Sequence, residues 1–201
     1  MKTELCELFE KYLADKTNWN GRGHSYSSEY YNLFKDLKEK KLNILEIGIG
    51  TRDAMVYLVG EEYKPGASLR AWRDFFINSQ IYAFDIVENV VFEEERIKCF
   101  QGDQSNNTGL QNVLQKMFDF NGNEFKFDII IDDGSHDLNH QVTSLLFLSK
   151  HLKENGVYIV EDVRASDIQH FKNLDVPNAS ITHIHYGNNA WDSFVVYKPT
   201  N

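Results

Sequence analysis

The chain has 201 residues, of which 42% are hydrophobic and 25% charged, and its formal net charge is −9. This length and composition fit one globular domain with a single core, and the acidic charge argues against a nucleic-acid partner, which would need a clustered basic face. No apolar run approaches the roughly 20 residues needed to span a bilayer, and the acidic N-terminus is unlike a basic leader. The two cysteines form no disulfide framework. We therefore expect a cytoplasmic protein without a membrane partner.

The first part of the chain is predicted to be helical. Apolar residues recur at helical spacing over residues 3–14, which predicts an amphipathic helix. A polar, glycine-containing stretch over residues 17–28 precedes a second predicted helix over residues 29–40. Because the stretch that contains His24 and Tyr26 lies just before the first strand, we expect it to act as a mobile lid over the strand ends.

Strands and helices then alternate along the chain. The strands are nearly continuous apolar runs, which is typical of strands buried on both faces of a largely parallel sheet. The predicted strands are Asn43–Ile47, Ile81–Phe84, Ile97–Phe100, Phe127–Ile131, Val157–Val160, Ile181–His185 and Phe194–Tyr197. The predicted helices between them are Ser68–Phe76, Thr108–Phe118, Asn139–Leu152 and Ser166–Asn173. Ser68 is the predicted N-cap of the first of these helices, and Gly156 the predicted stop of the third.

The end of the chain is predicted to be a hairpin. Only a short turn, Gly187 to Asp192, separates the last two strands, so they should pair antiparallel. The sequence therefore predicts an α/β fold, a doubly wound, Rossmann-like, seven-stranded sheet with an antiparallel C-terminal hairpin. We expect one domain over residues 1–201, with a helical cap in 1–41 and the Rossmann-like core in 42–201.

Ligands of such sheets bind at the carboxyl ends of the strands. Gly48 and Gly50 follow the first strand and let the backbone approach a ligand closely. Asp85 ends the second strand, where an acid can accept both hydroxyls of a ribose, in adenosylmethionine or in a nicotinamide dinucleotide. Asp103 and Gln104 follow the third strand and could bond an adenine edge. Each of these residues could instead cap a turn or a helix.

Two acidic pairs follow the fourth and fifth strands. One lies in Asp132-Asp133-Gly134-Ser135-His136, and the other is Glu161-Asp162. Carboxylates that converge on one sheet edge repel each other unless they are neutralised. Mg²⁺ or Mn²⁺ would relieve that repulsion, because these ions prefer oxygen ligands. Helix capping by the same acids is the alternative interpretation.

These blocks resemble the macrocin and mycinamicin type of sugar O-methyltransferase, which are class I methyltransferases that use S-adenosylmethionine. The resemblance runs from about Asp15 to Asp162. The blocks that carry it are Asp15-Lys16, His24-x-Tyr26, Tyr30, Leu45-Glu46-Ile47-Gly48, Gly66-Ala67-Ser68-Leu69-Arg70-x-Trp72, Ile81-Tyr82-x-x-Asp85-Ile86, Gln101-Gly102-Asp103-Gln104, Asp132-Asp133-Gly134-Ser135-His136 and Val160-Glu161-Asp162.

The resemblance implies a role for each matching residue. Asp133, Glu161 and Asp162 would hold Mg²⁺ or Mn²⁺, and His136, with Asp133, would be catalytic, His136 as the general base. The cofactor-binding residues expected on these grounds are Glu46, Gly48, Gly50, Ser68, Asp85, Asp103, Gln104 and Asp132.

The acceptor is expected to be a small sugar-type molecule. Relative to the macrolide enzymes we expect a shorter protein without their extra N-terminal domain, and Met55–Lys64 replaces a more glycine-rich loop. Both differences bear on the acceptor pocket, so a deoxysugar or a nucleotide sugar is expected at least as much as a glycosylated macrolide. The sequence leaves open whether the chain forms a homo-oligomer.

Other functions stay open at this point. A catechol-like phenol would suit the same metal chemistry. A nicotinamide-dependent oxidoreductase is disfavoured by the missing third glycine of the dinucleotide fingerprint and by the acidic cluster. A metal-dependent oxygenase and a binding module without catalysis are the remaining alternatives.

Overall fold

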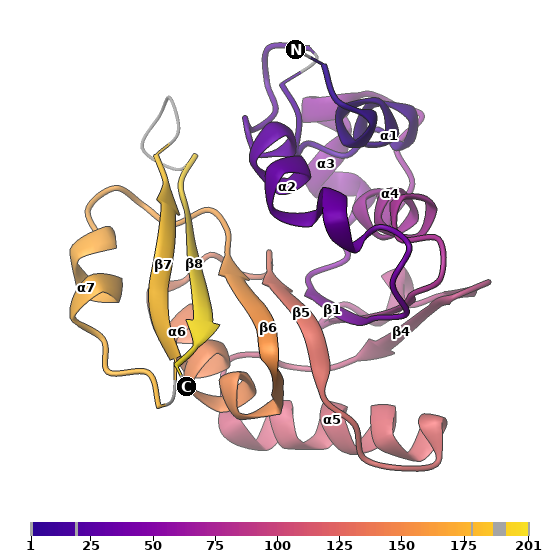
Figure 1. The fold of residues 1–201 in the computed structure, drawn as a ribbon. Helices are drawn as coiled ribbons and strands as arrows, with labels where there is room; N and C mark the ends of the chain where they lie inside the picture. Colours follow the sequence, from indigo (N-terminus) through magenta and orange to yellow (C-terminus); the bar gives the residue numbers. More distant parts are fainter. Residues whose placement is uncertain (1, 19, 178, 187–191, 201) are drawn as a thin grey trace.

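The computed structural model describes residues 2–18, 20–177, 179–186 and 192–200. It contains a mixed sheet of eight strands with helices on both faces (Figure 1). The α-helices are α1 (Glu4–Tyr12), α2 (Ser27–Phe34), α3 (Arg52–Val59), α4 (Ala67–Phe75), α5 (Asn107–Asn121), α6 (Leu138–Leu148) and α7 (Ile168–Asn173). The 3₁₀ helices are η1 (Lys35–Leu37), η2 (Glu88–Val90) and η3 (Ser149–His151). None of the helices in these described ranges has the length and apolar character needed to cross a membrane.

The sheet has the order β3-β4-β2-β1-β5-β6-β8-β7. Its strands are β1 (Asn43–Ile47), β2 (Gln80–Asp85), β3 (Glu93–Glu94), β4 (Ile97–Gln101), β5 (Phe127–Asp132), β6 (Leu152–Val160), β7 (Ala179–His185) and β8 (Phe194–Pro199). The strands β4, β2, β1, β5 and β6 pair parallel, and β8 pairs antiparallel with both β6 and β7. The predicted doubly wound fold with an antiparallel C-terminal hairpin is therefore confirmed, while 187–191 of the predicted turn lie outside the described residues.

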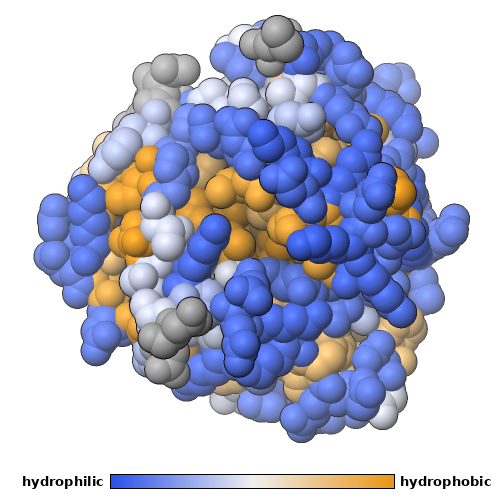
Figure 2. All heavy atoms as spheres, viewed as in Figure 1, coloured by the Kyte–Doolittle hydropathy of each residue, from blue (hydrophilic) through white to orange (hydrophobic). Residues whose placement is uncertain are grey.

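The core lies in two layers, one on each face of the sheet. Successive strand residues point to opposite faces, so Ile44 packs in the same cluster as Trp72 of α4, and Leu45 in the same cluster as Leu110 of α5. Figure 1 accordingly shows α1, α2, α3 and α4 grouped on one side and α5 and α6 on the other. Figure 2, drawn from the same direction, shows hydrophilic residues around a central hollow with a hydrophobic floor.

The structure differs from the sequence prediction in several local features. It adds two elements, the two-residue edge strand β3, which is too short to show a period, and α3, whose only buried residue is Val59. Ser68 is not the N-cap of α4, because Gly66 takes that position and Ser68 lies inside the first turn. Gly156 does not stop α6, since α6 ends at Leu148 and Gly156 lies within β6.

The N-terminal helices pack tightly on the rest of the molecule. The rings of Phe9 and Trp72 meet edge to face, with centroids 4.9 Å apart, and Tyr30 stacks against Phe194 of β8 at 5.4 Å. Tyr26, which the sequence assigns to a mobile lid, is 0% exposed and belongs to the main core cluster. Its aromatic ring packs against Phe194 of β8. The polar, glycine-containing stretch around Tyr26 gives no sign of this contact, because Phe194 lies far away in the sequence.

Candidate active site

A cavity of about 520 Å³ opens where the parallel strands end. Its wall includes Gly48 and Gly50 after β1, Asp85 at the end of β2, Gln104 after β4 and His136 after β5. These residues lie far apart in the sequence, and the parallel strands bring them to one edge of the sheet, as expected for this fold.

Close backbone packing shapes this edge. Gly48 has a φ of +92°, and a Cβ atom at this position would collide with the carbonyl oxygen of Asp133. The turn after β1 is held by Asp85, whose two carboxylate oxygens accept hydrogen bonds from the backbone N–H groups of Ile49 and Val87, each at 2.9 Å. The turns after β1, β2 and β5 therefore support one another at the cavity.

The expected cofactor-binding residues fall into two groups. Six of them line the cavity, namely Gly48, Gly50, Ser68, Asp85, Asp103 and Gln104. The other two, Glu46 and Asp132, are 0% exposed and lie beneath it.

The amide of Gln104 links the cavity wall to the buried Asp132. The Gln104 Nε2 atom donates to Asp132 Oδ1 at 3.0 Å, and its Oε1 atom accepts from the backbone N–H of Ser135 at 2.8 Å. Burial raises the pKa of Asp132 to about 7, against the hydrogen bond from Gln104, which lowers it. Asp103 also serves its own turn, because Oδ1 accepts from the backbone N–H of Ser105 at 2.8 Å.

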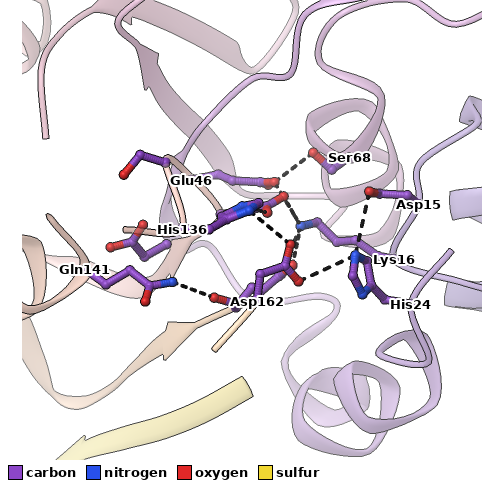
Figure 3. Close-up of polar contacts among 12 residues, drawn as sticks. Asp15, Lys16, His24, Glu46, Ser68, His136, Gln141 and Asp162 are labelled. Carbon is purple, nitrogen blue, oxygen red and sulfur yellow. Dashed lines mark hydrogen bonds and ion pairs between the residues drawn. The ribbon is translucent and has the colours of Figure 1, made fainter. Parts of the chain in front are cut away.

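An ammonium group lies in the middle of the acidic residues. Lys16 is 1% exposed, and its Nζ atom lies 2.7 Å from Asp133 Oδ2, 2.8 and 2.9 Å from the two carboxylate oxygens of Glu161, and 3.4 Å from Glu46 Oε1. Burial lowers the pKa of Lys16, but the charges of Asp133, Glu161 and Glu46 outweigh it and hold the pKa well above its usual value. Figure 3 shows Lys16 reaching this group from the N-terminal segment.

Neutral donors complete the surroundings of the two glutamates. Glu46 accepts hydrogen bonds from the Ser68 hydroxyl at 2.7 Å and from the Trp72 indole N–H at 2.6 Å. The Tyr30 hydroxyl donates to Glu161. Ser68 therefore borders the cavity and anchors Glu46 at the same time.

Three of the predicted catalytic and metal residues converge. Ligand atoms of Asp133, His136 and Asp162 all lie within 4.8 Å of one another. His136 Nε2 is 3.2 Å from Asp133 Oδ1, and His136 Nδ1 is 3.4 Å from Asp162 Oδ2. Burial lowers the pKa of His136, but the hydrogen bond to Asp133 and the charge of Asp162 outweigh it and raise the pKa to about 9. Glu161, the remaining predicted ligand, makes its charged contacts with Lys16 instead.

A second histidine borders this group. His24 Nε2 is 3.5 Å from Asp162 Oδ1, and His24 Nδ1 is 3.1 Å from Asp192 Oδ1. The His24 ring stacks on Tyr26 with centroids 4.8 Å apart, and the Tyr26 hydroxyl donates to Asp162 Oδ1 at 2.7 Å. The N-terminal segment thus reaches Asp162 from the side opposite His136.

Sequence reasoning missed Lys16, Tyr30 and Trp72 as parts of this site. Lys16 and Tyr30 belong to the motif blocks of the family resemblance without an assigned role, and so does Trp72 in the Ser-Leu-Arg-x-Trp block. A lysine next to an aspartate in a polar segment reads as a surface residue, because lysine is almost never fully buried unless it is paired. The available signal was the acidic cluster itself, which needs a cation.

Known proteins are similar to the chain in both sequence and fold. It is 34% identical to mycinamicin VI 2''-O-methyltransferase of Micromonospora griseorubida over 81% of the chain and 36% of that protein. It is 35% identical to demethylmacrocin O-methyltransferase of Streptomyces fradiae over 81% of the chain and 37% of that protein. No protein-family model matches the chain.

The solved structure of the MycE methyltransferase in complex with Mg, SAH and mycinamycin VI has the same fold, with a TM-score of 0.72 and 27% identity over 100% of this chain and 55% of that one. The chain spans little more than a third of the length of the two curated relatives, 36% and 37%. Both the sequence relatives and the fold show that the chain belongs to the class I, S-adenosylmethionine-dependent methyltransferases, in the family that includes the macrocin and mycinamicin sugar O-methyltransferases.

Proposed function

We propose that this chain transfers a methyl group from S-adenosylmethionine to a hydroxyl of a sugar, with the help of a bound divalent metal. The observation that carries the proposal is the convergence of Asp133, His136 and Asp162 next to the cavity at the carboxyl ends of the strands. The two curated relatives are both named O-methyltransferases, which supports the same reaction class.

The cavity suits the cofactor. Its volume of about 520 Å³ lies in the range of small-molecule sites. Gly48 and Gly50 carry no side chains, so the backbone of the turn after β1 can approach a ligand, and Asp85 on the wall supplies an acceptor for ribose hydroxyls. When bound, S-adenosylmethionine supplies a methyl group already activated by its sulfonium.

The acidic cluster suits a divalent cation. Asp133 and Asp162 carry carboxylate oxygens on either side of His136, and Glu161 is the third carboxylate of the proposed centre. Within the described part of the chain, Lys16 and His136 face the four carboxylates of Glu46, Asp133, Glu161 and Asp162, so negative charge is left for a divalent cation. Mg²⁺ or Mn²⁺, when bound, would lower the free energy needed to deprotonate an acceptor hydroxyl.

The protein's own groups would then orient the acceptor and remove its proton. His136 stands beside the two carboxylates with a partly exposed ring. Burial lowers its pKa, but Asp133 and Asp162 raise the pKa more, and a divalent ion held by these carboxylates would offset their effect and so leave a nitrogen able to accept the hydroxyl proton. Asp133 and Asp162 hold this ring from both nitrogens, which fixes its orientation. Correct alignment of the hydroxyl oxygen with the methyl carbon is the main demand of such an in-line transfer.

We further propose a deoxysugar, a nucleotide sugar or the sugar of a glycosylated small molecule as the acceptor. Neither nucleic acid nor membrane is expected as a partner, in line with the net charge of −9. A cytoplasmic location agrees with the two buried, unpaired cysteines, Cys6 and Cys99. Self-association into a homo-oligomer is left to measurement.

A methyl-transfer assay tests the proposal. Purified protein is incubated with labelled S-adenosylmethionine, Mg²⁺ and two acceptor panels, one of nucleotide sugars and glycosides and one of catechols. Label transfer to a sugar that stops in EDTA and returns with Mg²⁺ or Mn²⁺ is expected. Transfer only to catechols would replace the sugar by a phenol as acceptor, and full activity in EDTA would remove the metal from the reaction.

A further inference from the structure

Lys16 is, among the described residues, the buried lysine of the acidic cluster, and the proposed reaction leaves its role unexplained. It follows α1 and precedes the stretch that leads to α2, so it comes from outside the strands that carry the acidic residues. Lysine at 1% exposure is rare, because removing an ammonium from water is expensive unless it gains partners of opposite charge. Here three carboxylates provide those partners, one within β1 and two directly after β5 and β6.

The ammonium group joins the ends of two neighbouring strands. Asp133 follows β5 and Glu161 follows β6, and Lys16 Nζ contacts Asp133 Oδ2 at 2.7 Å and both oxygens of Glu161 at 2.8 and 2.9 Å. Without a cation between them these two carboxylates would repel each other at close range. Lys16 therefore keeps them together in a protein that has bound no other cation.

The two carboxylate oxygens of Asp133 have different partners. Oδ2 is taken by Lys16, and Oδ1 faces His136 Nε2 at 3.2 Å. In the described part of the chain Asp162 forms no ion pair with Lys16, and it lies 3.4 Å from the other nitrogen of His136. Lys16 thus neutralises the inner side of the cluster and leaves Asp133 Oδ1, His136 and Asp162 as the group that could hold a metal ion.

We propose that Lys16 is a positioning residue, a fixed internal cation that clamps Asp133 and Glu161 together and thereby prepares the acidic cluster for a divalent ion. The inference rests on the metal site of the proposed function. It makes the N-terminal segment part of the site, since the segment supplies the clamp as well as the hydroxyls of Tyr26 and Tyr30 that bond Asp162 and Glu161.

The test separates positioning from stability with two variants. Lys16→Met leaves Glu161 and Asp133 buried without their cation, and we expect a large fall in the midpoint of thermal unfolding. Lys16→Met combined with Glu161→Gln removes both charges of the pair, and we expect most of the midpoint to return. Lys153→Met, which breaks a half-exposed pair with Asp128 at 2.7 Å, is the control and should change the midpoint little.

Metal binding distinguishes a positioning role of Lys16 from a purely structural one. Titration with Mn²⁺ alone is expected to show at least tenfold weaker binding in the double variant than in Glu161→Gln alone, which lacks the same ligand charge but keeps Lys16, while the affinity for adenosylhomocysteine stays within about threefold. The kcat of the double variant should also fall by more than tenfold relative to Glu161→Gln, with little change in KM for the methyl donor. Equal Mn²⁺ affinity of these two variants at a restored midpoint overturns the inference, because Lys16 would then be structural only.

Two further outcomes are distinguishable. If wild type binds adenosylhomocysteine but no Mn²⁺, the metal mechanism fails, and so does the positioning role that rests on it, whatever the Lys16 variants do. If neither Lys16 variant folds, Lys16→Arg carries the test, since it keeps a buried cation but replaces the compact ammonium by a larger planar group and leaves every proposed metal ligand in place. At least tenfold weaker Mn²⁺ binding then supports the clamp, and wild-type Mn²⁺ affinity overturns it.

Discussion

His136 and Asp162 face each other across the site, with 3.4 Å between His136 Nδ1 and Asp162 Oδ2, and both hold left-handed backbone conformations, with φ values of 55° and 50°. Such a conformation costs a residue with a side chain about 1–2 kcal/mol relative to the right-handed region. Backbone strain of this kind clusters at functional sites, where the surrounding structure maintains it. The two residues are therefore held in place for their side-chain positions.

The first prediction concerns His136. His136→Ala should lower turnover by about 10²–10⁴-fold, the usual contribution of a positioned base, while adenosylhomocysteine and Mn²⁺ still bind. His136→Asn should lose as much activity but unfold with a free energy about 0.5–1 kcal/mol above that of the alanine variant, because asparagine tolerates the left-handed region better. Steady-state kinetics, calorimetry and denaturant unfolding check these values. Loss of Mn²⁺ binding in both variants would make His136 a metal ligand instead.

The second prediction uses two glycines with similar backbone angles. Gly48 has φ +92° and Gly60 has φ +104°, but a Cβ at Gly48 collides with the backbone of Asp133, whereas nothing lies within 4 Å of a Cβ at Gly60. Gly60→Ala should therefore cost about 1 kcal/mol of unfolding free energy through strain alone. Gly48→Ala should cost at least about twice as much and also abolish binding of adenosylhomocysteine, because the turns after β1 and β5 must separate. Equal unfolding free energies for the two variants would contradict the close approach.

The sequence predicts the sheet well and the site only in part, for physical reasons. A strand such as β1, buried on both faces, leaves a continuous apolar run, and its observed bounds, Asn43–Ile47, are the predicted ones. By contrast α3 buries only Val59 and so lacks a clear apolar stripe. Residues at the strand ends could be located because parallel strands end at one edge.

Lys16 shows where such reasoning stops. Its burial depends on carboxylates that stand 30, 117 and 145 positions further along the chain, namely Glu46, Asp133 and Glu161. No local pattern records those distances. The predicted ligands also divide in a way that spacing in the sequence does not record. Asp133 and Asp162 lie beside His136, whereas Glu161 lies beside Lys16, because the side chains after the strands point in different directions.

The third prediction tests how α1 is fastened to the core. Asp74 is partly buried, which raises its pKa, but hydrogen bonds from Tyr12, Lys11 and Arg73 outweigh this effect and lower the pKa to about 2. A carboxyl whose folded pKa lies below its unfolded value of about 4 stabilises the protein above that value, and loses the contribution as the pH falls through 2. After allowance for solvent screening, about 1–2 kcal/mol is expected.

Asp74→Asn should therefore lower the unfolding free energy by about 1–2 kcal/mol at pH 7, and the difference from wild type should vanish near pH 2. Urea unfolding at several pH values measures it. Glu61→Gln is the control, because Glu61 pairs with Arg52 while its side chain is 79% exposed, and it should change the free energy by less than about 0.5 kcal/mol. A difference for Asp74→Asn that persists at pH 2 would assign the effect to lost packing.

The fourth prediction concerns Asp85 and the methyl donor. Its carboxylate lines the cavity and also accepts the backbone N–H groups of Ile49 and Val87. Asp85→Ala should weaken adenosylhomocysteine binding by about 1–3 kcal/mol, because charge-assisted hydrogen bonds to ribose are lost and the turn after β1 loses its support. Asp85→Asn keeps the shape and one acceptor oxygen, so its loss should be smaller. Asp103 is the matched comparison on the same wall, because its carboxylate also accepts a hydrogen bond within its own turn, and Asp103→Asn is the corresponding variant.

Calorimetry measures the affinity of all three variants for adenosylhomocysteine, with NAD as a second ligand that should not bind wild type. Unchanged affinity in Asp85→Ala would remove Asp85 from the cofactor site, and tight NAD binding would return the oxidoreductase alternative.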